Sequence, residues 1–192
     1  MLKKLGIGTA LISLVFIFTA CISPEATPQF PETAATIDIE SPPESYKEPE
    51  IKPSPKPPGP IEGTWIEPAV DSEKQLVLLP LDEIEEKWNI HFKVETDKDD
   101  ITFMSYIYED QLHVRANVCP PCLSIGYALD EANGLLICDM CATLFDAGTG
   151  SGIKGACVDY PKAEVPYEIE DGNILLKGQN LLSAYQETLS PG

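Results

Sequence analysis

Four of the six cysteines form two CxxC pairs, Cys119/Cys122 and Cys138/Cys141, separated by fifteen residues. Two residues between cysteines let one tight turn direct both sulfurs at one ion, and two such turns complete a tetrahedral site. The C-x2-C-x15-C-x2-C spacing lies within the range of zinc sites. It suits an iron–sulfur cluster equally well, because such clusters are also held by four thiolates. The spacing therefore predicts a four-cysteine metal site and leaves the metal open.

The same thiols have interpretations without a metal. An exported protein can pair them in disulfides, and a CxxC pair can be a redox-active dithiol. The surrounding sequence does not resemble the βαβ unit of a thioredoxin-like active site. Leu123 and Ala142 follow the two pairs where a histidine would be needed, which argues against covalent attachment of c-type haem. The metal site is favoured, and disulfide chemistry stays open.

Cys157 follows a glycine-rich loop, residues 148–152, that can bring it near the paired cysteines. It is either a buried small apolar residue or a thiol that contacts or joins the ligands. His91 and His113 lie in alternating apolar and polar segments of the kind that form half-buried strands. A strand histidine is more often structural than a ligand, so both are left outside the predicted site.

The N-terminus is typical of an export signal. A short basic start precedes an apolar core at residues 5–18, which is too short to favour a spanning helix. Residues 18–21 (Phe-Thr-Ala-Cys) resemble a bacterial lipobox. We expect residues 1–20 to be a lipoprotein signal peptide and Cys21 to carry lipid, which places the chain outside the cytoplasm, anchored to a bacterial-type membrane. The alternative is an ordinary signal peptide or an uncleaved anchor.

Residues 21–60 hold eleven of the eighteen prolines and few large apolar side chains. Such a segment cannot bury enough surface to fold alone, and its proline content makes it an extended spacer. Residues 61–192 are long enough for one domain with a modest core. The formal charge of −18 argues against nucleic acid and is compatible with metal cations or a basic protein partner.

Short apolar or alternating segments with turn residues between them predict a mostly β fold, a small antiparallel barrel or sandwich. Two of the expected hairpins carry the cysteine loops at their edges. Residues 81–88 can form helical turns, and residues 181–188 a short helix or strand. The expected strands are residues 75–80, 89–95, 101–108, 111–118, 125–129, 135–138, 165–170 and 173–177.

The segment from Cys138 to Cys157, with the hairpin at residues 165–174, resembles the second half of a Rieske ferredoxin domain. There a Cys-x-x-His pair precedes a Phe-Asp, a glycine turn and a proline-led hairpin. Here Cys141 stands where the Rieske domain has histidine, and a second CxxC replaces Cys-x-His. The two-histidine, two-cysteine ligand set is therefore absent.

The sequence is more similar to the FtrD-like membrane iron–sulfur proteins, over roughly residues 75–177. The shared elements occur in order: Leu79-Pro80-Leu81, the first CxxC, Gly126-Tyr127, the second CxxC, a phenylalanine and a Gly-x-Cys ending at Cys157. The resemblance implies a cluster or metal held by Cys119, Cys122, Cys138 and Cys141, with Cys157 matching the later cysteine of the family. It also implies electron transfer or metal handling linked to iron, with a membrane redox or metal-transport protein as partner. A tethered lipoprotein without a multi-spanning portion departs from many relatives.

These observations predict a membrane-tethered electron carrier with an iron–sulfur cluster. A non-redox zinc or metal-binding module and a thiol–disulfide protein are the alternatives. No acid, base or nucleophile constellation accompanies the cysteines, so we expect no autonomous enzymatic reaction.

Overall fold

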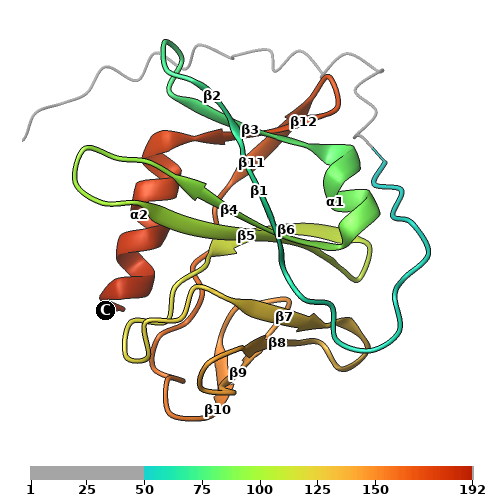
Figure 1. Ribbon diagram of the computed structural model, residues 1–192, viewed down its shortest axis with the longest axis vertical. Helices are drawn as coiled ribbons and strands as arrows, with labels where there is room; N and C mark the ends of the chain where they lie inside the picture. Colours follow the sequence, from blue (N-terminus) through green and yellow to red (C-terminus); the bar gives the residue numbers. More distant parts are fainter. Residues whose placement is uncertain (1–49, 192) are drawn as a thin grey trace, which may run out of the picture. The chain divides into compact units, whose positions relative to one another are not determined.

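A computed structural model describes residues 50–191, and the predicted signal peptide, Cys21 and most of the predicted spacer lie outside these residues. The described part contains three four-stranded sheets, which follow one another from top to bottom in Figure 1. The middle one, here called the central sheet, has the order β1-β4-β5-β6. Its strands are β1 (Thr64–Ile66), β4 (Asn89–Val94), β5 (Ile101–Tyr108) and β6 (Gln111–Ala116).

A second sheet, here called the cysteine sheet, has the order β10-β9-β8-β7 and lies at the lower end of Figure 1. All its pairings are antiparallel, and the register shifts between Gly152 and Lys154. A short 3-10 turn, η1 (Glu131–Asn133), connects β7 to β8. The strands are β7 (Tyr127–Asp130), β8 (Leu135–Cys138), β9 (Leu144–Asp146) and β10 (Gly152–Lys154).

The third sheet, here called the terminal sheet, joins strands from the two ends of the described chain in the order β11-β12-β3-β2. The hairpin of β11 and β12 turns at Asp171 and Gly172, both with positive φ, which is the backbone of a two-residue hairpin turn. The strands are β2 (Ala69–Asp71), β3 (Leu76–Pro80), β11 (Tyr167–Glu170) and β12 (Asn173–Lys177).

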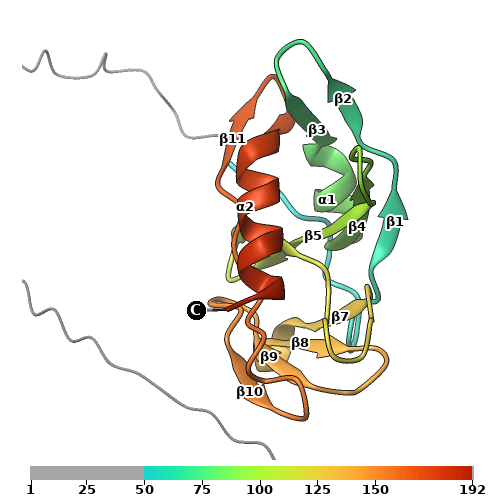
Figure 2. The ribbon, with the colours of Figure 1, turned by 90° about the vertical axis from the view of Figure 1, so that its left-hand side faces the viewer.

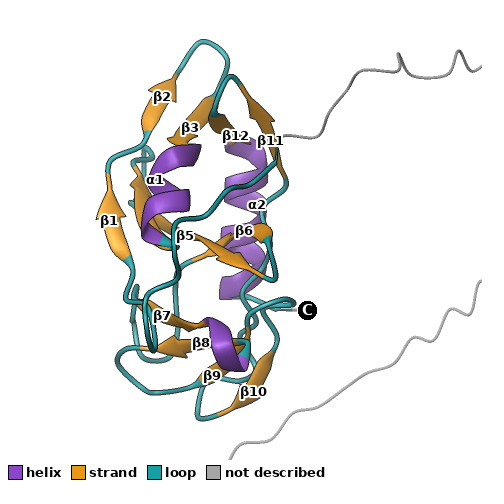
Figure 3. Ribbon diagram, turned by 90° about the vertical axis from the view of Figure 1, so that its right-hand side faces the viewer, coloured by secondary structure: helices purple, strands orange, loops and turns teal. Residues whose placement is uncertain are grey.

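Two helices pack on these sheets (Figures 2 and 3). The helix α1 (Leu81–Lys87) follows β3 and buries Leu81 and Ile84 against β4 and β5. The helix α2 (Gly178–Leu189) buries Leu181, Ala184 and Thr188 at the spacing of one helical face and contacts β6 and β12. It therefore connects the terminal sheet to the central sheet.

The mostly β class is confirmed, and so are the predicted hairpins of residues 101–118, 125–138 and 165–177. Residues 181–188 belong to a helix. The expectation of antiparallel pairing needs one correction, because β1 pairs with β4 in parallel. The strands β1, β2, β9 and β10 were not predicted, since three residues are too few to show a period.

Residues near the end of the predicted spacer contact α1. The backbone N–H of Ser54 donates to the Glu85 carbonyl at 2.7 Å, and the indole N–H of Trp88 donates to the Ser54 carbonyl at 2.9 Å. Ile51 is half-buried against the core. The segment just before residue 61 is therefore held against the domain. Within residues 50–191, neither helix has the length and apolar character needed to span a membrane.

Candidate metal centre

Five sulfurs meet at one end of the cysteine sheet. The Sγ atoms of Cys119, Cys122, Cys141 and Cys157 all lie within 4.8 Å of one another. The Cys138 sulfur lies 3.8 Å from that of Cys122, and the Cys141 and Cys157 sulfurs are 3.7 Å apart. All five are free thiols, and Cys119, Cys138 and Cys157 are buried. The structure thus brings together both CxxC pairs and the later cysteine.

The two CxxC loops have the same backbone geometry. The N–H of Leu123 donates to the Cys119 carbonyl at 2.7 Å, and the N–H of Ala142 donates to the Cys138 carbonyl at 3.0 Å. Leu123 and Ala142 both have a left-handed backbone, with φ of 60° and 52°. Each loop is therefore one tight turn that ends immediately after its second cysteine, so both sulfurs of a pair point to the same side.

A polar contact joins the two loops. Ser124 donates its hydroxyl to the Asp139 carboxylate, and the backbone N–H of Asp139 donates to the Gly126 carbonyl at 3.1 Å. A Cβ on Gly126 would lie 2.1 Å from a carboxylate oxygen of Asp139, so a larger residue there would displace this side chain. Gly126 therefore leaves room for the contact between Asp139 and Ser124.

Thr143 connects the second CxxC loop to the segment that carries Cys157. Its hydroxyl oxygen lies 3.1 Å from the Cys141 sulfur and accepts the backbone N–H of Cys157 at 3.3 Å. Gly155 has φ of +130°, and a Cβ there would lie 2.5 Å from the same hydroxyl oxygen. The backbone at Gly155 must pass against Thr143, and only glycine permits both this φ and this distance.

Arg115, near the end of β6, binds the glycine-rich loop and the segment after Cys157 through its guanidinium group. Its buried guanidinium donates to the carbonyls of Gly148, Thr149 and Lys162 and to the Tyr106 hydroxyl. The Tyr106 hydroxyl in turn donates to a loop carbonyl, that of Ala147, at 2.6 Å. Since these carbonyls belong to the glycine-rich loop and to the segment after Cys157, Arg115 positions the part of the centre that lies outside the CxxC loops.

Burial raises the pKa of most of these thiols. It raises the pKa of Cys119 to about 11 and also raises the pKa values of Cys122, Cys138 and Cys157. Burial acts in the same direction on Cys141, but hydrogen bonds from the Thr143 hydroxyl and backbone N–H, together with contacts to Cys138 and Cys122, outweigh it and hold the pKa of Cys141 at about 6. Cys141 is therefore the thiol that most readily becomes a thiolate.

The geometry fits a thiolate-bound metal. Four sulfurs about 2.3 Å from one ion in a tetrahedral arrangement lie about 3.8 Å from one another. The Cys122–Cys138 separation of 3.8 Å, within the predicted set, agrees with this spacing around a single ion, and so does the Cys141–Cys157 separation of 3.7 Å, whereas a disulfide needs about 2 Å. The ligand set of Cys119, Cys122, Cys138 and Cys141 stays a prediction, because the tightest group of four contains Cys157 in place of Cys138.

The two histidines lie outside this group. His91 is buried in β4, and its ring meets that of Trp65 edge to face at 5.3 Å between centroids. His113 stacks on Tyr106, with its Nδ1 3.4 Å from a Glu164 carboxylate oxygen. Both have pKa values lowered by burial, so both are neutral near pH 7.

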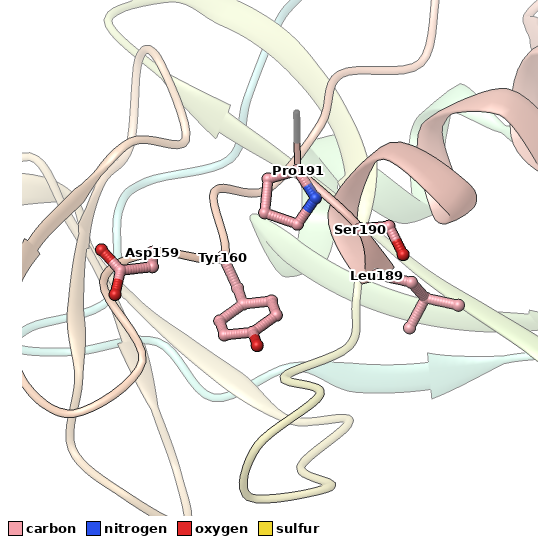
Figure 4. A pocket seen from close by; sticks show the side chains of 5 residues that line it. All are labelled: Asp159, Tyr160, Leu189, Ser190 and Pro191. Atoms are coloured by element: carbon pink, nitrogen blue, oxygen red, sulfur yellow. The ribbon is translucent and has the colours of Figure 1, made fainter.

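Two surface cavities lie apart from the thiols. One of about 590 Å³ lies between the segment after Cys157 and the end of α2, lined by Asp159, Tyr160, Leu189, Ser190 and Pro191 (Figure 4). A larger one of about 1060 Å³ is lined by residues of β6 and β11 and by Glu50 and Ile51. No cysteine lines either cavity.

The fold and the site together define a mostly β protein with a cluster of five cysteines that can hold a metal. Residues 84–187 match the family described as membrane iron-sulfur containing protein FtrD-like, and the chain belongs to this family. No curated protein matches the sequence.

Solved structures similar to this chain include ferredoxins and a Rieske protein. The Sphingomonas yanoikuyae B1 ferredoxin is 21% identical over 44% of this chain and 83% of its own, with a TM-score of 0.36. The ferredoxin of carbazole 1,9a-dioxygenase from Nocardioides aromaticivorans IC177 is 19% identical over 58% of this chain and 98% of its own, with a TM-score of 0.39. The plasma membrane Rieske protein PetC3 from Synechocystis PCC 6803 is 23% identical over 44% of this chain and 83% of its own, with a TM-score of 0.32.

Proposed function

We propose that this protein is an extracytoplasmic, lipid-anchored electron carrier that holds an iron–sulfur cluster on its two CxxC pairs. The observation that carries the proposal is the convergence of five thiols in a chain of an iron–sulfur protein family. An iron–sulfur cluster supplies one-electron redox chemistry when it is bound. Cys119, Cys122, Cys138 and Cys141 would hold it, because the two loops repeat one geometry and each directs two sulfurs to the same side.

The remaining residues of the site would tune and shield the centre. Tyr127 and Phe145 are buried and their rings meet edge to face at 5.8 Å, and we propose that they shield the inner side of the thiol cluster from water. The outer side lies under short loops that expose Leu123 and Met140, at 79% and 67% of their surface. An electron would therefore cross only a thin layer of protein between the centre and a partner, and we propose a membrane redox or metal-transport protein as that partner.

The full chain, solubilised in detergent and purified without oxygen, tests the proposal. Iron, zinc and acid-labile sulfide are measured per chain, together with the visible spectrum and a redox titration. Iron with matching sulfide and a reversible one-electron transition is the expected result. Zinc without sulfide, persisting after cluster reconstitution, would replace the proposal with that of a closed zinc site, which is structural because it leaves no open coordination position.

A thiol–disulfide protein is the other candidate, favoured by the low pKa of Cys141 and its contact with Cys157. Metal-free protein whose thiols titrate as a two-electron couple would support it.

The lipid anchor is tested separately by Cys21→Ser, which should move the protein from the membrane fraction to the supernatant. Unchanged membrane association of this variant would contradict lipidation of Cys21.

A further inference from the structure

Lys162 is a buried basic residue close to the thiols. Its side chain is among the largest that are fully buried, with 1% of its surface exposed. Its Nζ donates to the Val118 carbonyl at 2.7 Å and lies 4.5 Å from the centroid of the Phe145 ring. Within residues 50–191, no Asp or Glu side chain lies within ion-pair distance of it. An unpaired buried charge is costly, so another source of negative charge must offset this one.

The ammonium group lies beside the thiols. Val118, whose carbonyl accepts its hydrogen bond, directly precedes Cys119. The Tyr127 ring, 5.3 Å from Nζ, also contacts the centre, because its hydroxyl interacts with the Cys119 sulfur. Burial lowers the pKa of Lys162 to about 8, and the thiols act in the opposite direction, with Cys119 and Cys138 foremost. The side chain is therefore protonated at neutral pH and is affected by the charge of the thiols.

The lysine backbone is fixed in place. Its N–H donates to the Gly150 carbonyl at 2.8 Å, and its carbonyl accepts from the Arg115 guanidinium at 2.9 Å. Gly150 has φ of +75°, and a Cβ there would lie 2.3 Å from the Lys162 carbonyl oxygen. The chain is thus arranged to bring this residue close to β6 and the glycine-rich loop. A side chain held in this way at its base is directed inward, against the rings of Tyr127 and Phe145.

We propose that Lys162 is the fixed counter-cation of the cysteine centre and that its charge raises both the reduction potential and the metal affinity of that centre. Four thiolates around an ion leave net negative charge, and reduction adds more, so a nearby fixed positive charge stabilises the loaded and the reduced forms. The statement about potential rests on the proposed function. The statement about metal affinity holds for zinc as well.

The test compares Lys162→Met with Lys154→Met in the full chain. Both variants remove one positive charge, but Lys154 is exposed on β10, where solvent screens its charge. At a fixed applied potential, we expect Lys162→Met to lower the ratio of reduced to oxidised centre by at least about tenfold, or about 59 mV for a one-electron couple. Lys154→Met should change the ratio by less than about twofold.

A second variant, Lys162→Gln, keeps a donor for the Val118 carbonyl without the charge. It separates the effect of the charge from that of the hydrogen bond. If Lys162→Met does not fold, the reduction potential of Lys162→Gln is compared with that of Lys154→Met instead. A folded, metal-loaded Lys162→Gln protein whose reduction potential equals that of Lys154→Met would overturn the proposal.

If the chain holds only zinc, the proposed function fails, and competition with a chelator becomes the test of Lys162. About tenfold weaker zinc retention by the Lys162 variants is then expected, and equal retention would overturn the inference.

Discussion

The backbone N–H of Cys157 donates to the Thr143 hydroxyl at 3.3 Å, and the same hydroxyl oxygen lies 3.1 Å from the Cys141 sulfur. One fully buried threonine thus connects the cysteine outside the CxxC pairs to a cysteine within them. Cys157 is therefore held at the centre by its backbone, whether or not its sulfur binds the metal.

Replacing Thr143 with the isosteric valine should reveal this connection. The Cys157 N–H loses its acceptor and the Cys141 sulfur loses a donor, so we expect a loss of about 1–3 kcal/mol in the free energy of unfolding. Loss of a hydrogen bond to sulfur should also lower the reduction potential. Denaturant titration and redox titration measure the two effects. Thr96→Val, on an exposed loop outside the cysteine sheet, is the control and should leave the potential unchanged.

Single serine substitutions should separate the ligands from the fifth thiol. If the two CxxC pairs share one centre, Cys122→Ser and Cys138→Ser should each lose most of the bound metal, although they lie on different loops. Cys157→Ser should keep the metal content and change the potential or spectrum. Metal analysis of each purified variant gives the answer. Metal lost from Cys157→Ser and retained by Cys138→Ser would instead assign the ligands to the tightest group of four thiols.

Gly155→Ala should displace the segment that carries Cys157. The new Cβ would lie 2.5 Å from the Thr143 hydroxyl oxygen at a φ of +130°, so we expect a cost of at least about 2 kcal/mol in the free energy of unfolding. Gly172→Ala is a matched control, since Gly172 has φ of +73° and no atom within 4 Å of the added Cβ. It should cost only the left-handed backbone strain, about 1 kcal/mol. Equal destabilisation of the two variants would mean that the contact with Thr143 is unimportant.

Ala142 tests the shape of the second CxxC loop. Its side chain is exposed and its φ is +52°, so substitutions there change the backbone preference with little change in packing. A β-branched residue disfavours this φ, and we expect Ala142→Val to destabilise the loaded protein by about 1–2 kcal/mol and to weaken metal retention. Ala142→Gly should retain metal fully. Thermal unfolding and chelator competition compare the two variants. Equal stability and equal metal retention of Ala142→Val and Ala142→Gly would show that the left-handed backbone at residue 142 does not matter for the loop.

His91 should make stability depend on pH. Burial lowers its pKa from the ordinary 6.5 to about 4, and its Nε2 has no hydrogen-bond partner within residues 50–191. Below pH 6.5 the unfolded chain binds a proton that the folded chain excludes, so stability falls as the pH falls from 6.5 toward 4. The expected loss between pH 7.5 and pH 5 is about 2 kcal/mol. His91→Gln should remove this part of the pH dependence in denaturant titrations, and an unchanged slope would show that the histidine does not titrate in this way.

The sequence predicted most of the strands that show alternation or a turn signal. The strands β4, β5 and β6 alternate or run apolar over six to eight residues, and the short turn of Glu109 and Asp110 joins β5 to β6. The spacing of the CxxC pairs likewise predicted two facing loops, because this geometry is local. The strand β1 was missed because its partner β4 lies some twenty-five residues away, and its central residue, Trp65, is exposed.

Arg115 and Lys162 could not have been found in this way. In sequence, each is a single basic residue in a strongly acidic chain, which is typical of a solvated surface position. Their burial depends on carbonyl groups contributed by distant loops, and no local pattern records those contacts. The position of Cys157 had a weak signal in the glycine-rich loop, but its contact with Thr143 depends on how that loop closes.

The segment from residue 117 to residue 163, which contains all five described cysteines, leaves and re-enters the rest of the fold at one place. The backbone N–H of Ala116 donates to the Ala163 carbonyl, and that of Val165 donates to the Val114 carbonyl. The two ends of the segment are thus neighbours in a short ladder at the edge of β6. The segment that carries the cysteines is therefore an insertion whose two ends are joined by main-chain hydrogen bonds that involve no cysteine.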